Sequence, residues 1–208
     1  YEHQHGFRNK HGCDTQLLNT ITDFVNSYDS LSTLDLIILD FSKAFDVVSH
    51  PKLLFKIAQL GIHPNTRNWI KSWLENRSHR VTVNGVTSSS KLVTSGVPQG
   101  SVLGPLLFLI YINDMPDSIY HSTLKLFADD SLLYHNIENH NDQSNLQTDL
   151  NNLISWSQKW QMHFNASKCE TMRITRSTSN ITCPSYCINN TQLDSVDSVK
   201  YLGVNIDH

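Results

Sequence analysis

Two short apolar segments that each lead into acidic residues constrain this chain more than any other feature of its sequence. Leu34–Asp40 is rich in Leu and Ile and ends on Asp40, whereas Leu124–Ala128 leads into Asp129 and Asp130, after which a second apolar run begins. Runs of this length, bounded by polar residues, are typical of buried strands. We therefore expect a hairpin with Asp129-Asp130 as its tight turn, and a distant strand that ends in the same way.

The acidic residues at these strand ends suggest a chemistry if the strands are neighbours in one sheet. The carboxylates of Asp40, Asp129 and Asp130 would then converge at one edge and repel each other unless a cation is bound, and hard divalent cations prefer carboxylate oxygens. Such a set could hold two Mg²⁺ ions for an in-line phosphoryl transfer. An isolated Asp-Asp pair is more often a solvated turn, so this interpretation depends on Asp40 reaching the same place.

The remaining patterns predict helices around the sheet, and therefore one palm-like α+β unit. A helix from Asp14 carries an apolar stripe that we expect to lie in the core, formed by Leu17, Leu18, Ile21, Phe24, Val25 and Tyr28. Further helices are expected after Pro51 and Pro64, over 102–112 with Ser101 as its cap, and in a long amphipathic segment that contains Leu146, Leu150, Leu153, Ile154 and Trp160. Asn84-Gly85 and Gly203 indicate hairpins.

The segment Ser95–Ser101 contains two Gly and one Pro, so it cannot be regular structure. A Gly-rich loop that leads into a buried helix allows backbone N–H groups to approach a ligand closely. Many Gly-Pro loops only turn the chain, so this loop is weak support for a binding site when it is considered alone.

Charge is unevenly distributed, although the whole chain carries a net charge of only −3. Basic residues dominate between positions 50 and 91, on the expected outer faces of two helices: Lys52, Lys56, Arg67, Lys71, Arg77, Arg80 and Lys91. Such a basic face suits a nucleic-acid backbone, although ordinary solvated helices give the same pattern. No apolar run is long enough to span a membrane, so we expect no membrane partner.

Several stretches occur in a characteristic order: Leu39-Asp40-Phe41-Ser42-Lys43-Ala44-Phe45-Asp46, then Gly96-Val97-Pro98-Gln99-Gly100-Ser101, then Phe127-Ala128-Asp129-Asp130. Together they resemble the reverse transcriptase domain of LINE-type (non-long-terminal-repeat) retrotransposons. Gln4–Arg8 looks like this family's segment at the end of the fingers, Phe164–Lys168 like its lysine-bearing loop, and Tyr201–Gly203 like its primer-grip hairpin. The resemblance covers essentially the whole chain.

The resemblance implies an α+β reverse-transcriptase palm, in which helices back an antiparallel sheet. Residues 1–33 would be the end of the fingers, 34–175 the palm, and 176–208 the end of the palm with the primer-grip hairpin. The family's upstream Arg-Pro-Ile stretch and its thumb are not among these residues, and the chain does not begin with Met. We therefore expect a piece of a longer protein, and its activity in isolation is an open question.

The resemblance also implies roles for individual residues. Asp40 and Asp129 would ligate the metal ions, with Asp130 beside them and the Phe41 carbonyl as a further ligand. The backbone N–H groups of Lys43 and Ala44 would meet the incoming triphosphate, Phe45 would be the steric gate against a 2′-hydroxyl, and Gln99 and Gly100 would line the nucleotide and template side. Lys168 would be the general acid for pyrophosphate, and Tyr201, Leu202 and Gly203 would hold the primer end.

The implied function is RNA-directed DNA polymerase. It would use an RNA template, a DNA primer, deoxynucleoside triphosphates and two Mg²⁺ ions, which Mn²⁺ could replace, in an intracellular protein of nucleus and cytoplasm; the sequence does not set an oligomeric state. One alternative is a truncated or domesticated relic that binds nucleic acid or protein without catalysis. Another is an unrelated two-metal nuclease or cyclase, which shares the acids but does not explain the Gly-rich loop or Phe45.

Overall fold

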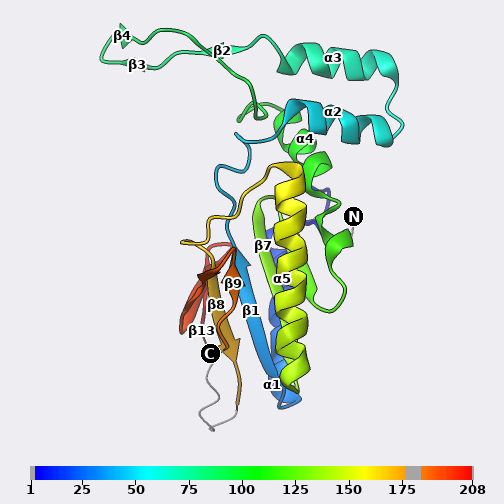
Figure 1. Cartoon of the computed structure of the whole chain (residues 1–208), viewed down its shortest axis with the longest axis vertical. Coiled ribbons are helices and arrows are strands. Elements are labelled where there is room, and N and C mark those ends of the chain that lie inside the picture. The colour runs from blue at the N-terminus through cyan, green and yellow to red at the C-terminus, as the bar shows by residue number, and fades with distance from the viewer. Residues whose placement is uncertain (1–2, 177–183, 208) are drawn as a thin grey trace. The chain divides into compact units, whose positions relative to one another are not determined.

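The computed structural model of this 208-residue chain describes residues 3–176 and 184–207. The chain forms two compact units (Figure 1): a sheet unit, which comprises Tyr1–Ser42 and Asn113–His208, and an insert unit, which comprises Lys43–Ile112. The Ser/Thr/Asn-rich composition of residues 175–192 predicts a loop, and 177–183 of this stretch lie outside the described residues.

The sheet unit is built on five strands in the order β11-β8-β1-β7-β6. Their bounds are β1 (Thr33–Leu39), β6 (Thr123–Phe127), β7 (Asp130–Ile137), β8 (Glu170–Ile174) and β11 (Asp194–Ser195). The pairs β8-β1, β1-β7 and β7-β6 are antiparallel, as expected for a palm, while the short β11 adds to β8 in parallel. The central strand β1 is buried almost throughout, because a strand covered on both faces reads as a continuous apolar run.

Two hairpins complete the C-terminal part of the sheet unit. They are β9 (Cys187–Ile188) with β10 (Thr191–Gln192), and β12 (Ser198–Tyr201) with β13 (Val204–Asp207). The predicted final hairpin is confirmed, and its bend falls at Leu202 and Gly203, whose φ angles are 47° and 87°.

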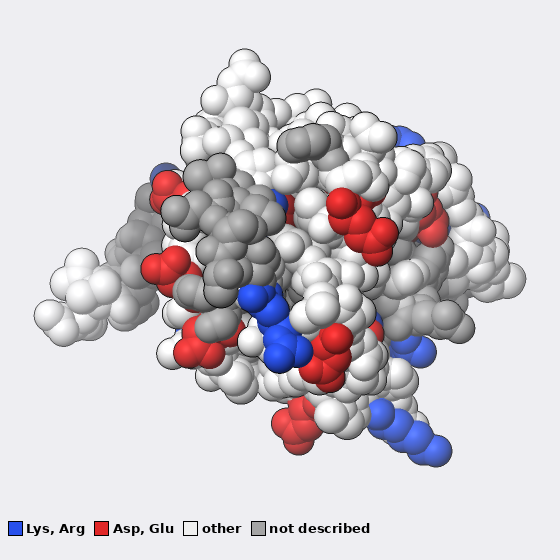
Figure 2. Space-filling view, turned by 90° about the horizontal axis from the view of Figure 1, so that it is seen from below, with Lys and Arg blue, Asp and Glu red and all other residues white. Residues whose placement is uncertain are grey.

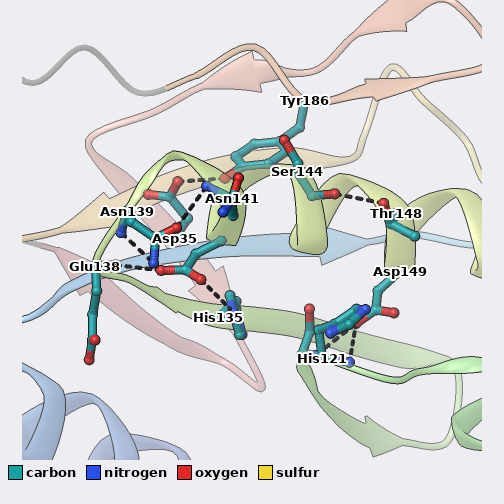
Figure 3. A network of polar contacts seen from close by, with 12 residues as sticks. Asp35, His121, His135, Glu138, Asn139, Asn141, Ser144, Thr148, Asp149 and Tyr186 are labelled. Atoms are coloured by element: carbon teal, nitrogen blue, oxygen red, sulfur yellow. Dashed lines mark hydrogen bonds and ion pairs between the residues drawn. The ribbon is translucent and has the colours of Figure 1, made fainter.

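The long helix α5 (His140–Trp160) lies along one face of the sheet, and α1 (Cys13–Asp29) lies on the opposite face (Figure 1). As predicted, Leu146, Leu150 and Leu153 of α5 are fully buried. The helix begins at a capping box, in which the Asp142 carboxylate accepts a hydrogen bond from the Asn139 N–H at 2.9 Å; the Asn139 side chain also accepts from the Asn141 N–H at 2.8 Å (Figure 3).

Helix α5 is also attached to the loop that precedes β6. The fully buried carboxylate of Asp149 accepts hydrogen bonds from the backbone N–H groups of Tyr120, His121 and Ser122 at 3.0, 2.9 and 2.7 Å (Figure 3). Charge-assisted bonds of this kind are stronger than neutral ones. They fix the start of β6, the strand that leads to Asp129.

The prediction that the apolar stripe of α1 lies in the core is wrong for most of its members. Phe24 is buried, but Leu18, Ile21, Val25 and Tyr28 are between 40% and 67% exposed. The side of α1 that faces the sheet instead carries Gln16, Thr20 and Ser27, and polar bonds set the rotation of the helix. Gln16 Nε2 donates to the Tyr201 hydroxyl at 3.1 Å, and Ser27 donates to Asn136 at 2.8 Å.

The insert unit contains three helices and two small hairpin pairings. Its elements are α2 (His50–Gln59), α3 (Pro64–Leu74), β2 (Ser78–His79), β3 (Thr82–Val83), β4 (Val86–Thr87), β5 (Lys91–Leu92) and α4 (Leu103–Ile112). The short 3₁₀ helix η1 (Met115–Ser118) follows in the sheet unit. Ser101 accepts a hydrogen bond from the Gly104 N–H at 2.9 Å, which confirms it as the cap of α4.

One of the basic residues expected on the outer helix faces lies in the interior instead. Lys56 is only 5% exposed, because its ammonium group donates to the Tyr111 carbonyl and lies 5.1 Å from the centre of the Tyr111 ring. The remaining basic residues of this stretch are partly or fully exposed. On the face of the molecule drawn in Figure 2, acidic and basic side chains are mixed among uncharged ones. None of the described helices is long and apolar enough to cross a membrane.

Candidate active site

Asp40 directly follows β1, and Asp130 begins β7, the strand beside β1. The two strands run antiparallel, and Leu39 at the end of β1 pairs with Ser131. Extending this register by one residue places Asp40 opposite Asp130, next to Asp129. The expectation that these two distant strands are neighbours is confirmed, and it brings the three acids to one end of the sheet.

The turn between β6 and β7 consists of Ala128 and Asp129. The predicted turn, Asp129-Asp130, is wrong by one residue, because Asp130 still pairs with Phe127 across the hairpin. Ala128 is buried and has a φ of 53°, in the left-handed region that few residues other than Gly adopt. We call Ala128–Asp130 the acidic turn; its two carboxylates follow directly after a strained backbone position.

The carboxylates of the acidic turn are held in an unfavourable electrostatic environment. Burial raises the pKa of Asp129, and the charge of Asp40 raises it further, while a backbone hydrogen bond opposes the shift. The side chain of Asp130 reaches the surface, yet loss of water around it raises its pKa too, and the charges of Asp129 and Asp40 add to this effect. A bound cation would relieve this repulsion.

Carboxylate oxygens are suitable ligands for a divalent cation, so the chemistry of these three donors fits a metal site. Their arrangement is less complete: the described part of the chain contains no group of three or more His, Cys, Asp or Glu side chains that could hold a metal ion as they stand. The roles of Asp40, Asp129 and Asp130 as metal ligands therefore remain predictions.

The lysine-bearing loop Phe164–Lys168 is attached to the backbone around Asp40. The Asn165 N–H donates to the Asp40 carbonyl and the Ser42 N–H donates to the His163 carbonyl, each at 2.8 Å, and the Phe41 and Phe164 rings stack at 4.5 Å. The Lys168 N–H closes the loop onto the Asn165 carbonyl at 2.9 Å. The Lys168 side chain is exposed. The Phe41 carbonyl takes no part in the two hydrogen bonds that join this loop to the backbone around Asp40.

Cys169 contacts Asp40 directly, which sequence reasoning missed. The Asp40 N–H donates to the Cys169 sulfur at 3.4 Å, and the thiol is 1% exposed. Burial, assisted by the negative charges of Asp40 and Glu170, raises the pKa of Cys169 to about 11. The only signal in the sequence is its place directly after the lysine-bearing loop, and it requires knowledge of the fold to interpret.

Within the insert unit, the segment after Ser42 and the Gly-rich loop lie against each other. The Val97 N–H donates to the Phe45 carbonyl at 2.9 Å, and the Ser95 hydroxyl donates to the Asp46 carbonyl at 2.8 Å. Gly96 has a φ of 85°, and a side-chain Cβ at this position would lie 2.7 Å from the Asp46 carbonyl oxygen. Only Gly fits here, because both the conformation and the space exclude a side chain.

The two segments line an open pocket of about 750 Å³ whose residues include Lys43, Asp46, Arg77, His79 and Gln99. Gln99 Nε2 donates to the Asp46 carboxylate at 3.4 Å. Phe45 is half-buried and stacks on Phe108 of α4 with ring centres 4.2 Å apart, so the predicted gate residue has a fixed orientation. Ala44 is buried, whereas Lys43 and Gly100 are exposed.

His50 and Arg77 hold the Gly-rich loop, although no motif in the sequence indicates these contacts. His50 Nε2 lies 2.9 Å from the Gly96 carbonyl oxygen, and an Arg77 guanidinium nitrogen donates to the same oxygen at 3.0 Å. Burial lowers the pKa of Arg77.

In the predicted primer grip, the side chain of Tyr201 belongs to the core of the sheet unit. It is 2% exposed, and burial raises its pKa to about 12, against the effect of the hydrogen bond from Gln16. Leu202 is half-buried and Gly203 is exposed at the bend. Tyr201 therefore anchors the end of β12, next to the bend, in the core of the sheet unit.

Comparison with known proteins places this geometry in a family. Residues 1–206 match the family model described as reverse transcriptase (RNA-dependent DNA polymerase). The RNA-directed DNA polymerase from mobile element jockey of Drosophila funebris is 35% identical over 98% of this chain and 23% of its own length. The probable RNA-directed DNA polymerase from transposon X-element of Drosophila melanogaster is 35% identical over 99% of this chain and 23% of its own length.

A solved structure supports the fold. Apo telomerase from Candida tropicalis, truncated from its C-terminal domain, covers 99% of this chain with 39% of its own length, at a TM-score of 0.65 and 17% identity. This likeness confirms the expected palm-like α+β fold. The chain spans about a quarter of the length of the curated relatives it matches. The chain belongs to the reverse transcriptase family, among the relatives found in non-long-terminal-repeat (LINE-type) retrotransposons.

Proposed function

We propose that this chain is the central part of an RNA-directed DNA polymerase that adds deoxynucleotides to the 3′-hydroxyl of a DNA primer on an RNA template. The observation that carries the proposal is the register of β1 and β7, which brings Asp40 beside Asp129 and Asp130 in a chain matched along its length by the reverse transcriptase family. The matched relatives are named as polymerases, which does not favour a non-catalytic relic.

In the sheet unit, Asp40, Asp129, Asp130 and the Phe41 carbonyl would hold two Mg²⁺ ions, for which Mn²⁺ is a possible substitute. Polymerases of this family generally use divalent ions, which would lower the pKa of the attacking hydroxyl and neutralise the negative charge that develops on the leaving oxygen. Burial raises the pKa values of Asp129 and Asp130, and repulsion from the neighbouring acids raises them further; this repulsion supports the role, since a cation would remove it. Lys168, on the loop attached to Asp40, would donate a proton to the departing pyrophosphate.

In the insert unit, the nucleotide would meet the segment that contains Lys43, Ala44 and Phe45. The backbone N–H groups of Lys43 and Ala44 would donate to the triphosphate, and Gln99 and Gly100 would border the base and the template. Phe45, held by Phe108, would exclude a ribose 2′-hydroxyl by steric clash, since a rigid ring cannot move away from the wrong substrate. Leu202 and Gly203, supported by Tyr201, would contact the primer end.

The proposed partners are an RNA template, a DNA primer and deoxynucleoside triphosphates. A chain with this activity would work inside the cell, in the nucleus and cytoplasm. The exposed basic residues of the insert unit, such as Lys71, Arg80 and Lys91, support contact with a phosphate backbone.

The decisive experiment is primer extension on an RNA template with the Asp129→Asn variant of the protein that contains this chain. We expect a loss of about 10³-fold or more in rate with unchanged folding, because the carboxylate acts on the reacting groups rather than on the core. Asp117→Asn, at an exposed position of η1, is the matched control and should extend primers at the parental rate. Parental activity of Asp129→Asn would refute the proposed function.

A further inference from the structure

The segment before α1 lies along the outer strand of the hairpin that carries the acidic turn. The His5 N–H donates to the Leu126 carbonyl and the Leu126 N–H donates to the His3 carbonyl, both at 2.9 Å. Gln4 thereby forms a parallel bridge with Leu126, two residues before Ala128. This segment therefore extends the sheet beyond β6, on the side away from β7.

The Gln4 side chain then reaches the acidic turn. Gln4 is fully buried, and its Oε1 accepts hydrogen bonds from the Ala128 N–H at 2.8 Å and from the Gly6 N–H at 2.7 Å. Two backbone donors converge on this oxygen, so the orientation of the amide is determined. Both lone pairs of the Gln4 carbonyl oxygen therefore accept a hydrogen bond. Through these two bonds the Gln4 amide joins the loop that contains Gly6 to the acidic turn.

Ala128 needs such support because its backbone is strained. A left-handed conformation costs a residue with a Cβ about 1 kcal/mol or more, and it persists only where the surroundings impose it. Asp129 and Asp130 follow immediately, so the direction of both carboxylates depends on the Ala128 dihedrals. A relaxed Ala128 would turn them away from the end of β1.

Gly6 makes the close approach possible. A Cβ added at Gly6 would lie 2.3 Å from the Ala128 nitrogen and 3.0 Å from Gln4 Oε1. The closer contact is with backbone, so no movement of a side chain could make room for the Cβ. The absence of a side chain at Gly6 and the amide of Gln4 are thus two parts of one contact.

We propose that Gln4 is a positioning residue for the acidic turn: with Gly6 beside it, the Gln4 amide holds Ala128 in its left-handed conformation and so directs Asp129 and Asp130 toward Asp40. This inference rests on the proposed polymerase function for its effect on catalysis. The contact itself consists of the two hydrogen bonds and the buried amide, and it can be measured without activity.

The test compares Gln4→Met with Gln147→Met. Met keeps the length of the Gln side chain but removes the acceptor, and Gln147 offers a matched control because its amide also bonds to backbone groups, accepting from the Cys187 N–H at 2.9 Å and donating to the Cys187 carbonyl at 3.0 Å. We expect amide hydrogen exchange at Ala128 to become about tenfold faster in Gln4→Met, and to stay parental in Gln147→Met.

Primer extension supplies the second measurement. In Gln4→Met we expect kcat to fall about tenfold or more with the KM for deoxynucleotide within about twofold of the parent, because misplaced carboxylates affect the chemical step. Adding Ala128→Gly should restore part of the lost kcat, since Gly adopts the left-handed conformation without strain. If the loss of kcat came only from a general loss of stability, kcat would fall alike in Gln4→Met and Gln147→Met. Adding Ala128→Gly would then not restore it.

Parental exchange at Ala128 in Gln4→Met, or an equal loss of kcat in Gln147→Met, would overturn the inference. If Gln4→Met does not fold, Gln4→Asn is the milder variant, because its shorter side chain cannot reach both N–H groups; unchanged protection of Ala128 would again refute the contact. If the parent protein extends no primer, the proposed function fails, while the exchange experiment still decides on Gln4.

Discussion

Asp35 and Asp40 lie close together along the chain, but neutralising each should affect a different property. Neutralising Asp35 should lower the stability of the fold, whereas neutralising Asp40 should abolish primer extension. Asp35 lies within β1 and is fully buried, whereas Asp40 lies just beyond its end. The Asp35 carboxylate accepts hydrogen bonds from Arg173 Nε at 2.6 Å, from a second Arg173 nitrogen at 2.7 Å, and from the Tyr186 hydroxyl at 2.6 Å. Figure 3 shows the Tyr186 hydroxyl directed at the Asp35 carboxylate. The bidentate ion pair of Asp35 and Arg173 joins β1 to β8, because the two residues lie opposite each other in these strands.

Asp35→Asn is expected to destabilise the chain by about 3–5 kcal/mol, the usual effect of removing one partner of a buried ion pair. Arg173 is only 9% exposed, so its buried charge would lose the Asp35 carboxylate that it contacts through two nitrogens. Urea denaturation followed by tryptophan fluorescence measures this loss. The triple replacement of Asp35 by Leu, Arg173 by Met and Tyr186 by Phe should cost less than Asp35→Asn alone, since it leaves neither a buried charge nor an unpaired hydroxyl.

Asp40→Asn is the matched comparison. It should abolish primer extension and leave the free energy of unfolding within about 0.5 kcal/mol of the parent, or raise it slightly, because it removes repulsion from Asp129 and Asp130. A cost below about 1 kcal/mol for Asp35→Asn, or an equal loss for Asp40→Asn, would refute this division of roles.

Three further predictions follow from the described contacts. Phe45→Ala should raise ribonucleotide incorporation about tenfold or more in a competition assay, and unchanged selectivity would refute the gate. Gly96→Ala should cost about 1–3 kcal/mol and raise the KM for deoxynucleotide, since its Cβ would clash with Asp46; parental stability by urea denaturation would contradict this. Tyr201 ionises near pH 10 when unfolded and near 12 when folded, so stability that is present below pH 10 should fall as the pH rises, by about 1 kcal/mol at pH 11. Denaturation at pH 8 to 11 tests this, and Tyr201→Phe should flatten the decline.

The strand pattern and the family motifs were enough to predict the palm-like sheet and the neighbourhood of Asp40 and Asp129. They succeeded because short apolar runs leave few ways to pair β1 with β7, and because the position of an acid at a strand end follows from the pairing. The turn was wrong by one residue because its strained position is occupied by Ala128, which has no turn signature, rather than by Asp or Gly.

The orientation of α1 and the supporting contacts of the site were not predictable in the same way. Apolar periodicity placed Leu18 and Ile21 in the core, but hydrogen bonds from Gln16 and Ser27 to residues far along the chain determine which side of α1 faces the sheet. The same holds for Gln4 with Ala128, for Asp35 with Arg173, and for Lys56 with Tyr111. Each joins polar groups more than fifty residues apart, and only a folded chain pairs them.

The number of residues in β1 matters as much as their identity, because it decides on which face of the sheet Asp35 lies. Side chains alternate between the faces of a strand, and Asp35 lies between Leu34 and Leu36, which belong to the apolar cluster around Phe24 on the opposite face. Deleting one residue between Asp35 and Asp40 while Asp40 keeps its place would bring the Asp35 carboxylate into that cluster and Leu34 against Arg173. We therefore expect this strand to tolerate exchanges among Leu, Ile and Val far better than any change in the number of its residues.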